Sequence, residues 1–252
     1  MNKVLTTRSN TTVNFLSSLY CWTVISALTV ILGILAVITS FFSANTSQSI
    51  AKLWGVLILK ACSVKVDITG SENLSPENSY IITSNHQSYF DIFVLLARLD
   101  ISFRFIAKKS LFKIPFLGRS MKRLGYIPID RENLRSALKS VKKSTELLKN
   151  KTSILIFPEG TRSPDGKLSS FKKGGLNMFL KQGNLAVLPV AIKGTVNILR
   201  KNSLTIHPGQ KVELRILKPI EISEKNKGLT SGKEDSIIKT IEEEIRAALE
   251  FK

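Results

Sequence analysis

The sequence has a long stretch without charge. From Ser9 to Ala51 there is no Asp, Glu, Lys or Arg, although the chain carries 37 basic and 19 acidic side chains. Within this stretch, residues 15–42 form a nearly continuous apolar run. About 20 such residues span a bilayer core as a helix, so the run is long enough to do so. It is too long for a cleaved signal peptide and lacks a typical cleavage site, which predicts a membrane element.

Cysteine and histidine are scarce, with two of each. Cys21 and Cys62 are too few for a disulfide framework or a zinc site, and we interpret them as small apolar residues in or near lipid. This use of cysteine fits a reducing, cytoplasmic environment for the rest of the chain. The two histidines, His86 and His207, are far apart in sequence and indicate no metal cluster. We therefore expect no metal and no other cofactor.

Acidic residues are outnumbered, which leaves a net charge of +18. The positive electrostatic field of such a chain attracts nucleic acid, anionic headgroups, phosphorylated metabolites or an acidic carrier protein. A basic chain that also has an apolar segment is better explained by anionic membranes, where each nearby Lys or Arg contributes roughly 1 kcal/mol. A tethered nucleic-acid binder is the alternative, but the sequence has no helix-turn-helix signature or aromatic-interleaved basic motif. We expect an anionic membrane as partner and no nucleic acid.

A second apolar stretch, residues 50–64, contains Lys52 and Lys60 and predicts an amphipathic helix whose lysines reach toward headgroups. Two arrangements remain open. The first run spans the bilayer while the second lies on its surface, or both form a hairpin in one leaflet. Basic residues flank the apolar region on both sides, so the positive-inside rule does not decide between these two arrangements. We favour the hairpin, because the remaining chain must reach lipid from the cytoplasmic face. Residues 1–63 are thus the predicted anchor, and 64–252 the predicted α/β domain.

Beyond residue 63, short β-branched runs alternate with helical patterns. This alternation predicts an α/β domain with a mixed, largely parallel sheet flanked by helices. Helices are expected at 89–99, at 131–150, shortly after Gly174 and at 233–251, with a linker at 223–232. Strands are expected at 64–69, 80–84, 103–107, 126–129, 153–157, 185–192 and, nearer an edge, 211–217.

The motif NHQSYFD, residues 85–91, lies between a predicted strand and a predicted helix, where open α/β sheets bind ligands. An imidazole such as His86 is suited to take a proton from an alcohol near neutral pH, and a carboxylate such as Asp91 can fix its tautomer. On one regular helix the two side chains would point about 140° apart, so they meet only if His86 lies in the loop. The alternative is that Ser88 and Asp91 form a capping box.

Two further motifs follow predicted strands. In FPEGTRS, residues 157–163, Gly160 allows close backbone approach to a ligand and Arg162 offers a planar fork for phosphate. The alternative is a Pro/Gly loop with a solvated arginine. In GYIPIDR, residues 125–131, Arg131 is another phosphate candidate, although Asp130 also suits the N-cap of a helix. A fourth run, VLPVA at 187–191, is interpreted as core near the site.

These four blocks occur in the order and at the spacing of the glycerolipid acyltransferase family with its HX4D motif. The chain resembles the bacterial 1-acyl-sn-glycerol-3-phosphate acyltransferases over about residues 64–217. The resemblance implies that His86 abstracts a proton and Asp91 orients it. It also implies that Lys108 faces the developing oxyanion. The acceptor phosphate would be bound by Glu159, Gly160, Thr161 and Arg162, together with Arg131. The family commonly has an acidic residue where this chain has Ser110.

The resemblance implies transfer of a fatty acyl group from acyl-CoA or acyl-carrier protein to the sn-2 hydroxyl of 1-acyl-sn-glycerol-3-phosphate. The product would be phosphatidic acid, made at the cytoplasmic face of the cytoplasmic membrane. There is no nucleophile-elbow GxSxG, so we expect direct transfer within a ternary complex. Two alternatives stay open. The acceptor is a different lysolipid, or the chain is a catalytically silent protein that binds anionic lipid.

Overall fold

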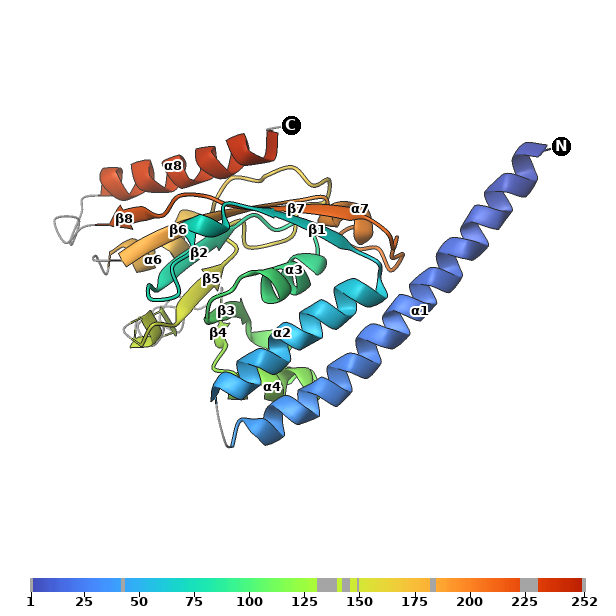
Figure 1. Ribbon diagram of the computed structural model, residues 1–252. Coiled ribbons are helices and arrows are strands. Elements are labelled where there is room, and N and C mark those ends of the chain that lie inside the picture. The colour runs from blue at the N-terminus through green and yellow to red at the C-terminus, as the bar shows by residue number, and fades with distance from the viewer. Residues whose placement is uncertain are drawn as a thin grey trace.

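The computed structural model describes residues 2–41, 44–130, 140–141, 146–148, 150–181, 185–222 and 231–250. Two N-terminal helices lie against one side of an α/β domain (Figure 1). Helix α1 covers Asn2–Thr39 and α2 covers Ala44–Ala61. Among the described residues, one helical stretch, 14–39, is long and apolar enough to cross a membrane. The predicted boundary at residue 63 falls between α2 and the first strand.

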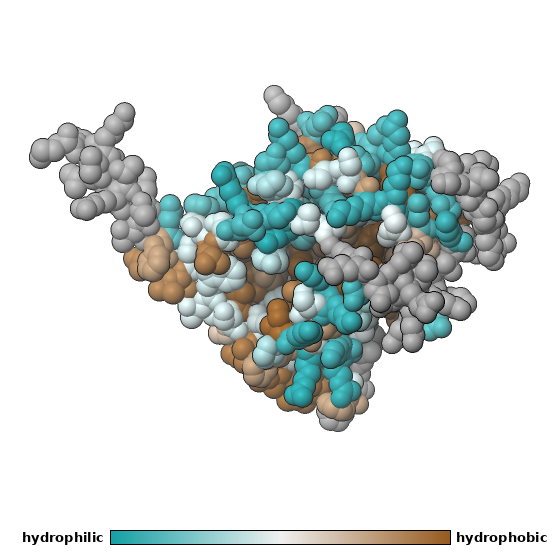
Figure 2. Space-filling view, turned by 180° about the vertical axis from the view of Figure 1, so that it is seen from behind, coloured by the Kyte–Doolittle hydropathy of each residue, from teal (hydrophilic) through white to brown (hydrophobic). Residues whose placement is uncertain are grey.

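Helix α1 is apolar on both of its faces, but only one face is covered by protein. Successive buried residues are three, four or seven positions apart, which is the spacing of one helical face. They are Ser18, Cys21, Ile25, Leu32 and Ala36. The opposite face forms an exposed apolar stripe of Phe15, Leu16, Leu19, Tyr20, Ile31, Ile34, Leu35 and Ile38. Figure 2 shows this hydrophobic surface running down to the lower tip of the molecule.

One expectation for the anchor needs correction. Cys21 and Cys62 do not face lipid, because both are fully buried in the core shared by α1, α2 and the sheet. The inward-facing stripe of each helix decides this, and composition alone did not reveal it. The Lys52 ammonium lies 2.8 Å from a carboxylate oxygen of Asp100, and its contact with headgroups stays a prediction.

The sheet is mixed and largely parallel, as predicted. Its order is β1-β7-β6-β2-β5-β3-β4, with β8 paired to β6. The strands β6, β2, β5, β3 and β4 run parallel, whereas β7 and β8 are antiparallel to β6 and β1 is parallel to β7. The bounds are Lys65–Thr69, Tyr80–Ser84, Phe103–Lys108, Ile127–Ile129, Ser153–Ile156, Leu185–Lys193, Lys211–Ile216 and Ile220–Ile222 for β1 to β8.

Helices cover both faces of this sheet, so its central strands are apolar on both sides. In β2, Ile82 packs in the core formed with α1, α2 and α3, while its neighbour Ile81 packs in the core formed with α6 and α8. The helices are α3 (Phe90–Arg98), α4 (Leu117–Arg123), α6 (Lys173–Leu180), α7 (Thr195–Ile198) and α8 (Ser231–Glu250). Two 3-10 turns, η1 (Ser71–Asn73) and η2 (Lys109–Lys113), complete the described elements.

All seven predicted strands are present within a few residues of their expected ends, and β7 lies second from an edge. The predicted helix at 131–150 falls mostly outside the described residues, as does most of the predicted linker. Residues 231–232 of that linker belong to α8 instead. The elements missed from sequence are α4, α7, β8 and the two 3-10 turns. Each is short, and three to seven residues give too little periodicity to read.

Candidate active site

The parallel strands bring the predicted motifs to one edge of the sheet. His86 follows β2, the 157–163 loop follows β5, and Lys108 ends β3. Parallel strands end at the same edge, and ligands bind there in open α/β sheets. Arg131 follows β4 in sequence, but it lies outside the described residues. Asp130, expected at a helix N-cap, lies 3.4 Å from the ammonium of Lys109.

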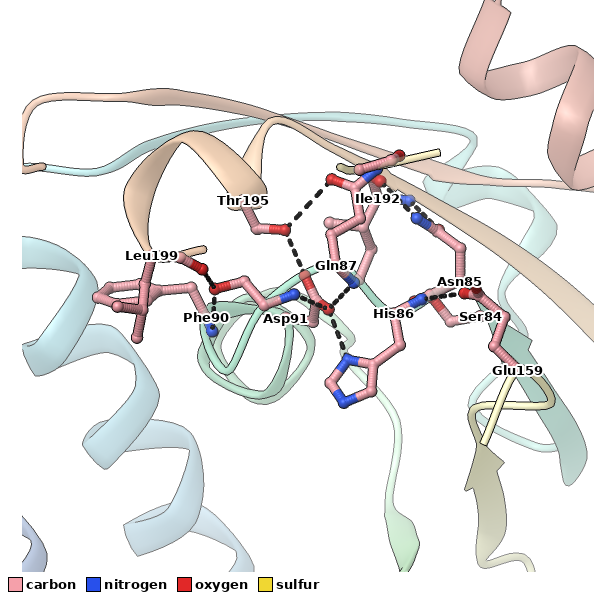
Figure 3. A network of polar contacts seen from close by, with 12 residues as sticks. Ser84, Asn85, His86, Gln87, Phe90, Asp91, Glu159, Ile192, Thr195 and Leu199 are labelled. Carbon is pink, nitrogen blue, oxygen red and sulfur yellow. Dashed lines mark hydrogen bonds and ion pairs between the residues drawn. The ribbon is translucent and has the colours of Figure 1, made fainter. Parts of the chain in front are cut away.

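His86 and Asp91 are in contact, with 2.7 Å between His86 Nδ1 and Asp91 Oδ2 (Figure 3). They meet because His86 lies in the loop and Asp91 in the first turn of α3. The backbone N–H groups of Gln87 and Ser88 donate to the same Oδ2, at 2.7 and 2.9 Å. The Asp91 carboxylate therefore accepts backbone N–H groups at the start of α3 and also orients the imidazole. The predicted capping role and the predicted catalytic role of Asp91 are compatible.

These contacts fix the state of the ring. Because Asp91 Oδ2 accepts from three sides, His86 Nδ1 must carry a hydrogen and donate it. In the neutral imidazole the lone pair is then on Nε2, which points away from Asp91 (Figure 3). The ring of Phe157 stacks on the imidazole at a centroid distance of 4.0 Å. His86 is therefore oriented as a proton acceptor at the sheet edge.

Thr195 is a site residue that the sequence analysis missed. Its hydroxyl donates to Asp91 Oδ1 at 2.5 Å, and both side chains are fully buried. Thr195 begins α7 directly after β6, and Gly194 before it has a φ of 103°, which favours glycine. For the fourth block, residues 187–191, the sequence predicts only core near the site. Following its strand to the carboxyl end would have located the threonine at the edge that holds His86.

Glu159 faces the His86 loop. Its Oε1 accepts the backbone N–H of His86 at 2.6 Å, and its Oε2 accepts that of Ser169 at 2.9 Å. The side chain is buried, which raises the pKa of the carboxyl group, whereas the two hydrogen bonds act in the opposite direction. Both oxygens are engaged by protein. The role that these contacts support is to fix the loop, and the predicted contact with a phosphate stays a prediction.

Arg162 lies in the loop that contacts the His86 loop. Its guanidinium stacks on the ring of Tyr89, with 3.7 Å between the guanidinium carbon and the ring centroid. The next residue, Ser163, donates its N–H to the His86 carbonyl at 2.8 Å. Stacking covers one face of the guanidinium and leaves its in-plane N–H groups available to an anion. Tyr89 was overlooked inside its motif, although an aromatic ring beside a candidate phosphate-binding arginine is a recognisable signal.

The remaining predicted residues are less closely tied to His86. Gly160 has a φ of 74°, so the turn requires glycine, and Thr161 is exposed beside it. Lys108 is exposed at the end of β3, which is separated from β2 by β5. Within the ranges that the structure describes, no group of three or more His, Cys, Asp and Glu side chains could hold a metal ion.

The loop that carries His86 is fixed to the neighbouring strand. The side chain of Asn85 donates to the Ile192 carbonyl and accepts from the Ile192 N–H, both at 2.8 Å. The Ser88 hydroxyl donates to the Leu199 carbonyl at 2.8 Å, after α7. These buried contacts hold the site on a rigid frame.

A largely apolar cavity of about 380 Å³ begins beside this site. Phe157 and Gly160 form part of its wall, and Lys172 is its charged residue. The rest of its wall includes Ile106, Ile156, Met178 and Phe179. The arrangement therefore combines a proton acceptor, a guanidinium and an apolar space at one sheet edge.

Comparison with known proteins agrees with this arrangement. A family model described as acyltransferase matches residues 65–193. A chloroplastic 1-acyl-sn-glycerol-3-phosphate acyltransferase of Arabidopsis thaliana is 42% identical over 172 residues, which are 68% of this chain and 48% of that protein. A 1-acyl-sn-glycerol-3-phosphate acyltransferase of Borreliella burgdorferi is 33% identical over 198 residues, covering 74% of this chain and 78% of that one.

Among solved structures, the 1-acyl-sn-glycerophosphate acyltransferase PlsC of Thermotoga maritima is similar, with a TM-score of 0.77 and 32% identity. The similarity covers 93% of this chain and 94% of that one, so it includes the two N-terminal helices as well as the sheet. The chain spans about half the length of the plant relatives that it matches.

Proposed function

This chain belongs to the acyltransferase family, and from that premise we propose that it acylates the sn-2 hydroxyl of 1-acyl-sn-glycerol-3-phosphate to form phosphatidic acid. The observation that carries the proposal is the His86–Asp91 pair, with Arg162 in a loop that is hydrogen-bonded to the His86 loop. A general base for the hydroxyl and a cation for the phosphate are the two groups that this acceptor requires.

In the proposed reaction, His86 Nε2 takes the proton of the lipid hydroxyl as its oxygen bonds to the thioester carbonyl carbon. The C–S bond then breaks, and the thiolate takes that proton back from the imidazolium. Asp91 Oδ2, which contacts Nδ1, stabilises the imidazolium. A thioester is already activated, so no energy cofactor is needed. The base contributes typically 10²–10⁴-fold in rate.

We assign the acceptor phosphate to Arg162, with Arg131 as a second cation and with Gly160 and Thr161 supplying the adjacent backbone. Lys108 is proposed to stabilise the oxyanion that forms on the thioester carbonyl. The apolar cavity beside Phe157 suits a fatty acyl chain. Acyl-CoA and acyl-carrier protein both fit as donors, because both are anionic and the chain has a net charge of +18.

We propose that the protein lies on the cytoplasmic face of the membrane with α1 and α2 in one leaflet. The buried stripe of α1 contacts protein from Ser18 to Ala36, about 27 Å of helix at 1.5 Å per residue. That length is close to the thickness of a hydrocarbon core, about 30 Å. A helix that packs against the rest of the protein over this length is not surrounded by lipid, as an isolated spanning helix would be. This packing favours the hairpin over a spanning helix.

An acceptor panel tests the proposal. The full chain in vesicles is assayed with lysophosphatidate, lysophosphatidylcholine and monoacylglycerol, each with acyl-CoA and with acyl-carrier protein. We expect efficient transfer to lysophosphatidate, and a raised KM for it in Arg162→Ala. Equal rates with monoacylglycerol would exclude the phosphate role of Arg162. Transfer to none of these acceptors from either donor would leave a catalytically silent lipid-binding protein.

A further inference from the structure

The segment between Asp100 and Asp130 contains seven Lys and Arg residues and no acidic residue. One of them, Arg104, is buried and donates to Gln48. Lys108 and Lys109 lie at the active-site edge. The others are exposed on η2 and α4, and we call this set the α4 basic surface: Lys113, Arg119, Lys122 and Arg123. A one-sign surface of this kind attracts anions.

Two large apolar side chains are exposed in the turn between the η2 and α4 parts of this surface. Ile114 is 44% exposed and Phe116 is 46% exposed, in the turn between η2 and α4. Phe116 has a φ of 59°. A bulky residue in this region is uncommon, because its side chain crowds the backbone. The turn would accept glycine more easily, yet it presents an aromatic ring to the outside.

This turn is continuous with the exposed stripe of α1. The Ser120 hydroxyl donates to the Gly33 carbonyl at 2.9 Å. A Cβ built on Gly33 would lie 3.7 Å from the Phe116 Cβ, so the two backbones are close. The Arg123 guanidinium carbon lies 4.3 Å from the ring centroid of Phe41, which is itself 66% exposed. Figure 2 shows hydrophilic side chains directly beside the hydrophobic lower tip.

We propose that the α4 basic surface is a docking site for a bilayer containing anionic phospholipid. Ile114 and Phe116 extend the lipid-facing stripe of α1 into the apolar region, while Lys113, Arg119 and Lys122 contact the headgroup phosphates. The inference rests on the membrane association proposed above and specifies the surface responsible for charge preference. Because η2 directly follows β3 and α4 leads into β4, docking here sets the active-site edge at the lipid surface.

A vesicle competition measures the charge preference. The full chain is offered phosphatidylcholine vesicles and vesicles that also contain phosphatidylglycerol, and its distribution between them is measured after flotation. We expect wild type to prefer the anionic vesicles. The triple variant Lys113→Gln, Arg119→Gln, Lys122→Gln should lose on the order of 100-fold of that preference, at about fivefold per charge.

A matched control removes three charges elsewhere. Lys181→Gln, Lys218→Gln, Lys239→Gln has the same net charge as the first triple, and its sites are the end of α6, the loop between β7 and β8, and α8. It should keep the wild-type preference. An equal loss in both triples would mean that only net charge matters, and an even distribution of wild type would also overturn the inference. Failure of wild type to bind either vesicle would instead reject the membrane association itself.

A second variant tests the apolar tip. Phe116→Gly removes the ring and relieves the positive φ, so it should fold at least as well as wild type by thermal unfolding. We expect it to bind both vesicle types several-fold more weakly, while keeping its preference for the anionic ones. Unchanged binding to phosphatidylcholine vesicles would exclude insertion of Phe116.

Discussion

Asp91 makes the most consequential set of contacts in the molecule. One of its oxygens holds His86 and two backbone N–H groups, and the other holds Thr195. With no exposure to water, each of these partners must come from the protein. The pairing of His86 with Asp91 was predictable from five-residue spacing and element type. The partner on the other oxygen was not, because Thr195 is 104 residues away in sequence.

Thr195→Val should lower kcat about tenfold with little change in KM, because Asp91 Oδ1 would lose its donor and the carboxylate could shift from His86. A buried acceptor without a partner also costs about 1–3 kcal/mol of stability. Thr195→Ser keeps the hydroxyl and should restore kcat. Steady-state kinetics of the three proteins check this, and a serine variant as slow as valine would show that only packing matters.

Glu159→Gln should destabilise the fold, although it is isosteric and removes a buried charge whose ionisation burial opposes. An amide offers one oxygen, so its NH2 group would face either the N–H of His86 or that of Ser169. We expect a loss of about 1–3 kcal/mol, measured by denaturant unfolding. Unchanged stability with a raised KM for lysophosphatidate would instead support the phosphate-binding role predicted from sequence.

At the scale of elements, the anchor is joined to the domain by close packing. Helix α2 crosses α3 at Gly55, where a Cβ would lie 2.8 Å from the Phe93 carbonyl oxygen and 3.1 Å from the Leu96 Cβ. Cys21 of α1 and Cys62 after α2 are buried in the same core as Ile82 of β2. Hydropathy predicted both helices, but it could not predict which face of each turns inward, because α1 is apolar on all sides.

Gly55→Ala should lower stability by about 1–2 kcal/mol, because overpacking costs about 1–3 kcal/mol and alanine recovers roughly 0.5–1 kcal/mol of helix preference. The matched control is Gly175→Ala in α6, where a Cβ would meet no atom within 4 Å. That change should stabilise by about 0.5–1 kcal/mol. Thermal unfolding in detergent measures both. Stabilisation by both alanines would contradict the close crossing of α2 and α3.

At the scale of the whole molecule, the site exists because parallel strands end together. Glu159 is 73 residues from His86 in sequence and Thr195 is 104 residues from Asp91, yet hydrogen bonds connect each pair. The β-branched strands such as β2 and β5 were predicted well, since runs like YIITS and SILIF are distinctive. Strand order was not predictable, because it depends on how the helices cover each face. The sequence alone therefore did not predict which motifs lie next to one another in space.

The proposed function depends on His86 acting as the base in acyl transfer. The most direct measurement is the initial rate of transfer to lysophosphatidate by His86→Ala, compared with wild type and with His207→Ala, which removes the other histidine. We predict a loss of at least about 10²-fold for His86→Ala, with vesicle binding unchanged, and no loss for His207→Ala. A His86→Ala protein that binds vesicles normally and retains wild-type rates would exclude His86 as the base.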